Sequence, residues 1–150
     1  MINIALYQPD IPQNTAAIIR LCACFNIKVH IIEPCGFNLN DSRFKRVAMD
    51  YAKLVKISKY ESFNTFRNKN SNSRIILMTT KARKKYYNFN FKKNDILLFG
   101  RESAGVSKEV HEKIGEKLKI PMIKKARSLN IVVSASIVSS EAIRQINFKR

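Results

Sequence analysis

Hydrophobic residues in this chain of 150 residues gather in short runs, which are separated by stretches with helical spacing. Short and nearly continuous apolar runs are typical of strands that are buried on both faces of a sheet. Strands are expected at residues 2–7, 29–32, 74–78 and 96–99, with a weak strand at 54–57 and a short one at 119–120. The last of these ends at Pro121, because proline has no N–H to donate to a neighbouring strand.

The stretches between these runs favour helices. Apolar residues between Ile18 and Phe25 fall at i, i+3, i+4 and i+7, which places them on one helical face, and Asn14 or Thr15 is a suitable N-cap. Further helices are expected at 41–50, at 61–67, from the cap Ser107 to Ile114, and from Ile131 onward. Small and apolar residues are so dense in the last helix that we expect it to pack on more than one side.

Strands that alternate with helices predict an α/β fold, with a mainly parallel sheet and helices on both of its faces. No internal repeat or linker divides the chain, so residues 1–150 are expected to form a single domain, long enough to bury a core without disulfides or metal. In parallel sheets, ligands bind beyond the carboxyl ends of the strands. Three loops are therefore candidates for ligand binding: residues 79–81, 100–105 and 121–130.

The chain is strongly basic, with 28 Lys and Arg against 11 Asp and Glu and a formal net charge of +17. Such an excess favours a polyanionic partner, nucleic acid above all. A generally basic composition without a role in binding is the alternative. The same two interpretations apply to the basic helix at 41–50 and to the tract Lys81–Tyr87, which mixes cations with tyrosines as RNA-binding segments do but also suits a solvated loop.

Other functional classes find little support in the sequence. No apolar run approaches the ~20 residues of a membrane-spanning helix, and the strand-like start has no basic segment or cleavage site of a signal peptide, so a cytoplasmic protein without a membrane partner is expected. Cys22, Cys24 and Cys35 are expected to be reduced, and the first two to lie in the core, because no second pair of metal ligands follows at matching spacing. His30 lies in an expected strand and His111 on an expected surface helix, so hydrolytic chemistry is poorly supported and no metal site is predicted.

The sequence GRESAG at 100–105 is neither a dinucleotide-binding fingerprint nor a Walker motif. However, NTAAIIR at 14–20, LFGRESAG at 98–105 and IPMIKKARSLN at 120–130 together resemble, in order and spacing, the three motifs of the SPOUT (SpoU-type) RNA ribose methyltransferases. The resemblance covers nearly the whole chain. It is closest to the small bacterial tRNA (cytidine/uridine-2′-O)-methyltransferases of the wobble position, which share the opening pattern NIxLYxPxIPxNT and the later pattern HIIEPxGF.

This resemblance implies S-adenosyl-L-methionine as methyl donor, S-adenosyl-L-homocysteine as product, tRNA bound in its anticodon region, a homodimer, and a deep trefoil knot in the C-terminal segment. It implies that Arg20 acts at the reacting ribose, by orienting the substrate and stabilising alkoxide charge rather than as a literal base, and that Asn14 supports this arginine or its loop. The implied cofactor contacts are Met78, Gly100, Glu102, Ile120, Met122, Ser128, Leu129 and Asn130. The expected RNA contacts are Arg20, from the resemblance, and Arg43, Arg46, Lys81 and Arg127, from the charge of the basic segments.

The chain also departs from the family's pattern. The departures are Ala16 and Ala48 in place of glycine, Arg101 in place of proline, Val132 and Val133 in place of polar residues, and Ser140 in place of tyrosine. Two alternative functions stay open: a 2′-O-methyltransferase of rRNA, and a knotted RNA-binding protein that has lost catalysis. The presence of Arg20, Glu102, Ser128 and Asn130 favours an active enzyme over the latter.

Overall fold

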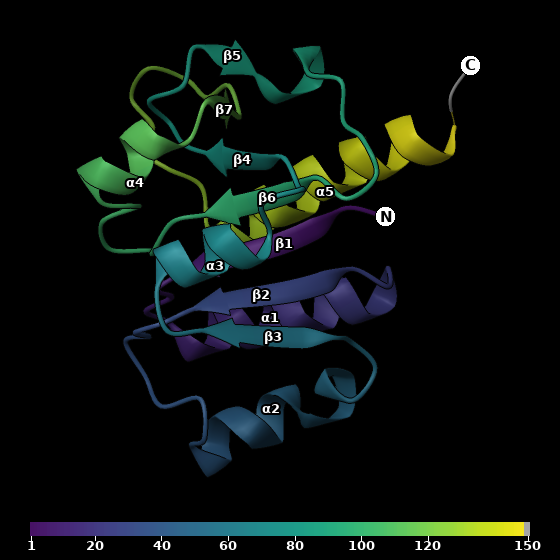
Figure 1. Cartoon of the computed structure of the whole chain (residues 1–150), viewed down its shortest axis with the longest axis vertical. Coiled ribbons are helices and arrows are strands. Elements are labelled where there is room, and N and C mark those ends of the chain that lie inside the picture. Colours follow the sequence, from purple (N-terminus) through teal and green to yellow (C-terminus); the bar gives the residue numbers. More distant parts are fainter. Residues whose placement is uncertain (149–150) are drawn as a thin grey trace.

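The computed structural model describes residues 1–148, which form one seven-stranded sheet with helices on both faces (Figure 1). Along the chain the elements are β1 (Asn3–Tyr7), α1 (Pro12–Cys24), β2 (Lys28–Ile32), α2 (Ser42–Ala52), β3 (Ile57–Tyr60), α3 (Phe63–Lys69), β4 (Ile75–Met78), β5 (Lys84–Lys85), η1 (Tyr86–Asn88), β6 (Ile96–Phe99), α4 (Lys108–Lys113), β7 (Glu116–Lys119) and α5 (Ile131–Asn147). The strands lie in the order β3-β2-β1-β6-β4-β7-β5, and all pairings between them are parallel. The predicted α/β class with a mainly parallel sheet is confirmed.

The interior strand β1 contributes to two layers of the core, one on each face of the sheet. Ile4 packs in one cluster with residues of α1 and α5, whereas the next residue, Ala5, packs in a second cluster with residues of α3 and α4. Successive side chains of a strand point to opposite faces of the sheet. Because helices cover both faces, β1 is buried from Ile4 to Tyr7 and reads as a continuous apolar run.

The last helix contacts two neighbours, as its density of small residues predicted. Ala135, Val138 and Ala142 of α5 are fully buried against the sheet and against α1. Small side chains on this face allow the helix to approach both neighbours closely. The outer face of its first turn is different, because Val133 is 46% exposed.

The strand expected at 54–57 is wrong. Leu54 lies beyond the end of α2 and is 67% exposed, and the strand is β3, which pairs with β2 from Val29↔Ile57 to Ile32↔Tyr60. Pairing with β2 selects this register, although residues 54–57 are locally the more apolar segment. The short strand expected at 119–120 is β7, which ends before Ile120.

Two helices begin at other residues than predicted. Helix α1 begins at Pro12 with Ile11 as its N-cap, so neither Asn14 nor Thr15 caps it. Pro12 suits the first helical position because proline has a helical φ and no N–H that needs a partner. Helix α3 begins at Phe63, because the Ser62 hydroxyl accepts a hydrogen bond from the Thr65 N–H. The cap predicted at Ser107 is confirmed for α4.

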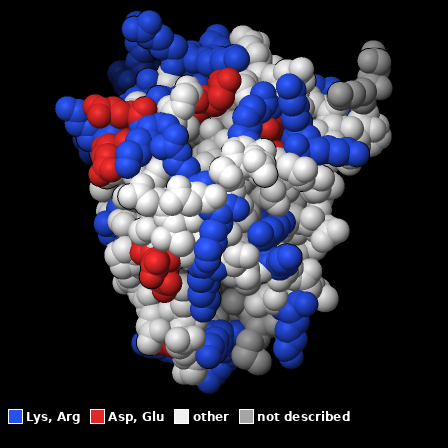
Figure 2. Space-filling view, viewed as in Figure 1, with Lys and Arg blue, Asp and Glu red and all other residues white. Residues whose placement is uncertain are grey.

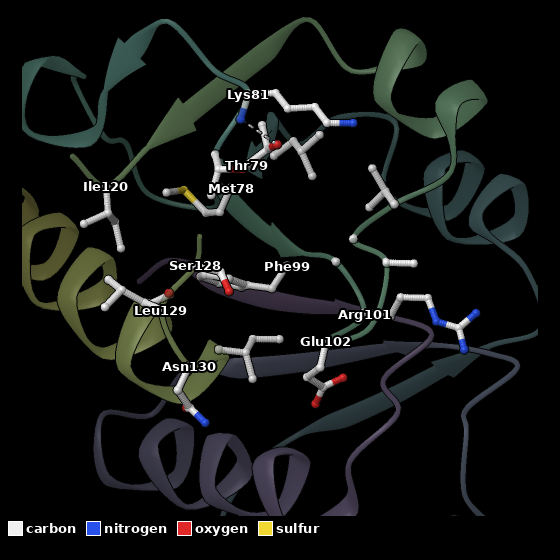
Figure 3. A pocket seen from close by; sticks show the side chains of 18 of the residues that line it. Met78, Thr79, Lys81, Phe99, Arg101, Glu102, Ile120, Ser128, Leu129 and Asn130 are labelled. Atoms are coloured by element: carbon white, nitrogen blue, oxygen red, sulfur yellow. Dashed lines mark hydrogen bonds between the residues drawn. The ribbon is translucent and has the colours of Figure 1, made fainter. Parts of the chain in front are cut away.

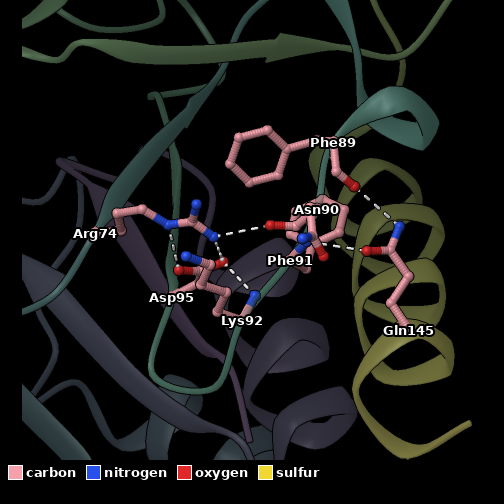
Figure 4. A network of polar contacts seen from close by, with 7 residues as sticks. All are labelled: Arg74, Phe89, Asn90, Phe91, Lys92, Asp95 and Gln145. Atoms are coloured by element: carbon pink, nitrogen blue, oxygen red, sulfur yellow. Dashed lines mark hydrogen bonds and ion pairs between the residues drawn. The ribbon is translucent and has the colours of Figure 1, made fainter. Parts of the chain in front are cut away.

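An ion pair ties the beginning of β4 to the beginning of β6 (Figure 4). The Arg74 guanidinium donates to both carboxylate oxygens of Asp95, at 2.8 and 2.6 Å, and the Asp95 side chain is only 3% exposed. Gln145 of α5 extends this network, since its amide donates to the Phe89 carbonyl and accepts from the Phe91 N–H. The segment that leads into β6 is therefore fixed to a strand on one side and to the C-terminal helix on the other.

We predict that Arg74→Ala lowers the free energy of unfolding by about 2–4 kcal/mol, because it leaves a buried carboxylate without its counterion. Chemical denaturation followed by circular dichroism measures the loss. The matched control is Arg43→Ala, because the Arg43 side chain is 88% exposed and its ion pair with Asp41 should contribute little. Equal stabilities of the two variants would contradict the structural role of the pair.

Candidate functional site

The carboxyl ends of β4, β6 and β7 surround a cavity of about 490 Å³. All three candidate loops contribute to its wall, together with the start of α1 and the first turn of α5. The wall contains Asn14 and each of the proposed cofactor contacts: Met78, Gly100, Glu102, Ile120, Met122, Ser128, Leu129 and Asn130. The strand order explains this convergence, because β4 pairs with both β6 and β7 and all three strands end at the same edge of the sheet.

The wall combines apolar side chains with a few polar groups. Met78 and Ile120 lie at one end of the cavity in Figure 3, and the polar side chains of Glu102 and Asn130 lie at the other, with Ser128 between them. Sites for small organic ligands have this composition, in which apolar surface gives affinity and a few polar groups fix the orientation.

A chain of hydrogen bonds at the polar end joins three segments that are distant in sequence. The Glu102 carboxylate accepts from the Asp10 backbone N–H at 2.8 Å and from the Asn14 amide at 3.2 Å. The Asn14 carbonyl oxygen accepts in turn from the Asn130 amide, at 3.3 Å. Asn130 is also the N-cap of α5, and its side-chain oxygen accepts from the Val132 N–H. This end of the cavity is thus built on fixed polar contacts.

The loop at 100–105 is held by a second carboxylate. Asp10 accepts from the Arg101 guanidinium at 2.6 Å and from the backbone N–H of Ser103 at 3.0 Å. The Arg101 guanidinium and the Ser103 hydroxyl keep the pKa of the Asp10 carboxyl well below its usual value. A Cβ at Gly100 would lie 2.5 Å from the backbone of Gly105, so this tight turn itself requires glycine there.

Comparison with known proteins identifies the family of this chain. Residues 1–140 match the model of the SpoU rRNA Methylase family. The chain belongs to the SpoU methylase family. Two of the loops that line the cavity, at 100–105 and 121–130, belong to the second and third motifs shared with this family, and Asn14 of the first motif also lies in the wall.

Individual SpoU methylases resemble the chain over nearly its whole length. A tRNA (cytidine(34)-2′-O)-methyltransferase of Beijerinckia indica is 46% identical over 145 residues, which cover 95% of this chain and 91% of the relative. A structure solved in a study of the 2-OH methylation of C/U34 on tRNA is 36% identical, with a TM-score of 0.91 over 97% of this chain and 95% of that one. The SpoU methyltransferase AviRb from Streptomyces viridochromogenes, solved with the cofactor AdoMet, shares the fold at 20% identity, with a TM-score of 0.89 over 99% of this chain and 58% of its own.

Most of the proposed RNA contacts of this SpoU methylase lie outside the cavity. Lys81 is in the cavity wall, and Arg127 is exposed on the loop that carries Ser128. Arg43 and Arg46 are exposed on α2, and so is Arg20 on α1.

Arg20 is not part of the cavity wall of its own chain. Its guanidinium lies 4.9 Å from the centre of the Tyr51 ring of α2. Among the described residues, Asn14 forms its side-chain hydrogen bonds with Glu102 and Asn130 and not with Arg20. The supporting role of Asn14 for Arg20 or its loop therefore stays a prediction.

Sequence reasoning missed the place of His111 in the cavity wall. Burial, together with the nearby cations Lys117 and Lys81, lowers the pKa of its imidazole and so favours the neutral ring. The helical pattern placed His111 on a surface helix, and the sequence carries no signal that α4 folds back over the loop at 100–106.

The remaining titratable candidates behave as core or surface residues. His30 is buried, its Nδ1 lies 2.9 Å from the Tyr60 hydroxyl, and burial lowers its pKa to about 4. Cys22 is buried as predicted, but the prediction is wrong for Cys24, which is exposed because α1 ends there. Within residues 1–148 no group of three or more metal-ligating side chains is found, and no helix is long and apolar enough to cross a membrane.

We predict that Asp10→Asn lowers the free energy of unfolding by about 1–3 kcal/mol at neutral pH, since it removes charge-assisted hydrogen bonds. The folded pKa of Asp10 is depressed, so its contribution is complete above the unfolded pKa of about 3.9 and is lost as the pH falls below it. The variant should therefore lose stability less steeply than the parent protein on acidification. Denaturant titrations from neutral pH to about pH 3 test this, with the exposed Asp50→Asn as control, and parallel curves for Asp10→Asn and the parent protein would contradict it.

Proposed function

We propose that this SpoU methylase transfers a methyl group from S-adenosyl-L-methionine to the ribose 2′-hydroxyl of cytidine or uridine at the wobble position, residue 34, of tRNA. The observation that carries the proposal is the near-full-length match to a relative with that named activity, combined with the fact that residues of all three motifs line one cavity. The family description names rRNA, so methylation of rRNA is the second candidate.

The cavity suits such a cofactor. Its volume of about 490 Å³ lies within the range of about 300–1,000 Å³ that is typical of small-molecule sites. Met78, Ile120 and Leu129 offer apolar surface for an adenine ring, and the Ser128 hydroxyl offers a polar contact among them. When bound, S-adenosyl-L-methionine supplies an electrophilic methyl group and leaves as S-adenosyl-L-homocysteine. Glu102 and Asn130 keep the wall in shape through their hydrogen bonds to Asn14.

The difficult part of the reaction is the nucleophile, because a ribose hydroxyl hardly ionises at neutral pH. We assign its activation to Arg20, which orients the ribose and stabilises developing alkoxide charge, while the hydroxyl proton passes to water, since an arginine side chain retains its own proton in proteins. Arg20 lies outside the cavity wall of its own chain, so we infer a homodimer in which Arg20 of each copy faces the cavity of the other. Exposed apolar residues around the cavity support such a contact: Ile11, Leu129 and Val133 are 41%, 39% and 46% exposed.

We also propose that the C-terminal segment forms a deep trefoil knot. Strand β7 lies between the earlier strands β4 and β5, and the chain that follows it returns to pack α5 against α1. Knots are rare among proteins in general, so this proposal draws its support from family membership and from this order of strands.

The function is tested with purified protein, labelled S-adenosyl-L-methionine, and separate tRNA and rRNA pools that lack the modification. We predict label in 2′-O-methylcytidine or 2′-O-methyluridine from tRNA, detected by nucleoside mass spectrometry. A synthetic anticodon stem-loop should accept the methyl group, and the same RNA with a 2′-deoxyribose at residue 34 should not. Label on a base, or in rRNA alone, would overturn the proposal.

We predict that Arg20→Ala reduces methyl transfer by about 100-fold or more while calorimetry shows unchanged binding of S-adenosyl-L-homocysteine. Arg67→Ala, at an exposed arginine of α3, is the matched control and should retain activity. Ser128→Trp should block the cavity. Coexpressed Arg20→Ala and Ser128→Trp chains should recover about a quarter of the parent activity, because a two-fold symmetric dimer then contains one intact site in half of the dimers. Full inactivity of the mixed dimers would exclude action across the dimer.

A further inference from the structure

The edge strand β5 and its surroundings carry a concentration of cations that the cavity does not use. Residues 79–94 contain six Lys and Arg and no Asp or Glu, and residues 117–140 contain five Lys and Arg and no Asp or Glu. These segments are adjacent in space, because β5 pairs with β7 through Lys84↔Leu118 and Lys85↔Lys119. Lys and Arg gather at the top of the molecule in Figure 2, where Figure 1 places β5 and β7.

These cations have no carboxylate partners among the described residues. The ion pairs of residues 1–148 involve Arg43, Arg74, Arg101, Lys108, Lys113 and Arg144, of which none is on β5, on β7 or on the loop at 120–130. Lys85 and Lys119 are direct neighbours across two parallel strands, and like charges so placed repel each other. A bound polyanion would remove this repulsion.

An exposed aromatic ring accompanies the cations. Tyr87 is 47% exposed, the Lys85 ammonium lies 5.8 Å from the centre of its ring, and the Tyr86 ring meets it edge-on at 5.3 Å. Lysines on an edge strand also prevent pairing between sheets of different molecules. That role accounts for Lys84 and Lys85 but not for an open tyrosine, which is the feature by which proteins stack on unpaired bases.

The position of this surface relates it to the cavity. Lys81 is in the cavity wall, and Lys85 follows four residues later, so the chain separates them by at most about 14 Å. After β7, Lys124 and Lys125 belong to the loop that brings Ser128 into the cavity wall. An RNA loop whose ribose enters the cavity would therefore extend over β5.

We propose that Arg83, Lys84, Lys85 and Tyr87, together with Lys119, form an RNA-docking surface for the loop that presents the reacting ribose. The cations contact phosphates on one side of the reacting nucleotide, and Tyr87 stacks on an unpaired base. This proposal rests on the proposed function, because it assigns to the same site the residues that hold the RNA without contacting the methyl donor.

The test compares two triple variants of equal charge. Arg83→Gln/Lys84→Gln/Lys85→Gln alters the docking surface, and Lys53→Gln/Lys56→Gln/Lys59→Gln alters the opposite end of the sheet, where these lysines are also exposed. Affinity for a synthetic anticodon stem-loop is measured over a series of salt concentrations. The first variant should bind about tenfold more weakly or worse and lower the salt slope by roughly 2, and the control should stay within about twofold of the parent protein. Equal effects of both triples would overturn the proposal.

Tyr87 provides an independent measurement. Tyr87→Ala should weaken RNA binding by about fivefold or more, and Tyr87→Phe, which keeps the ring, should bind as the parent protein does. Equal affinity of all three proteins would overturn the stacking assignment.

Further measurements separate this proposal from the proposed function. Thermal unfolding and S-adenosyl-L-homocysteine affinity should be unchanged in the docking variants, and their methyl transfer should show a raised KM for RNA with kcat retained. If the parent protein transfers no methyl group but binds RNA, and only the docking variants bind it weakly, the surface is supported and the enzyme function is rejected. If the docking variants lost binding to phosphatidylglycerol vesicles but bound RNA as the parent protein does, RNA would be overturned as the partner.

Discussion

The Glu102 carboxylate is the contact on which the geometry of the cavity depends. Its two oxygens accept hydrogen bonds from Asp10 and Asn14, which lie 92 and 88 residues earlier in the chain. Asn14 then binds Asn130, so one short polar chain fixes the position of a β6 loop, the start of α1 and the start of α5. Removing the carboxylate would separate the β6 loop from Asn14, and, within residues 1–148, only the Asp10 carboxylate would then hold this loop, through Arg101 and Ser103.

The few acidic residues of this basic chain hold the structure together. Asp95 joins two strands through Arg74, Asp10 holds the loop at 100–105 through Arg101, and Glu102 holds the cavity wall. These carboxylates are engaged in the fold, and the cations on β5, on β7 and on the loop at 120–130 form no ion pair among the described residues. Part of the net charge of +17 therefore lies on β5, on β7 and on the loop at 120–130, beside the cavity.

Structure also accounts for several positions at which the chain departs from its family. Ala16 of α1 and Ala48 of α2 are both buried and belong to one cluster between the two helices, where a methyl group on each side fills space that glycine would leave open. Val132 contributes its main-chain N–H to the cap formed by Asn130, a role that does not depend on its side chain. At Arg101, where the family's pattern has proline, an ion pair with Asp10 restrains the loop.

Local patterns in the sequence determined the α/β class, four of the main strands within one residue, the cap at Ser107, and the three loops that meet at the cavity. These predictions succeed because a strand that is buried on both faces of the sheet has a continuous apolar sequence, and because parallel strands end at the same edge of the sheet. Tertiary structure alone decided the register of β3, the place of His111 in the cavity wall, and the position of Arg20 outside the cavity of its own chain. These features arise from pairing and packing between segments that are far apart in sequence. The local order of polar and apolar residues does not encode the energy of such contacts.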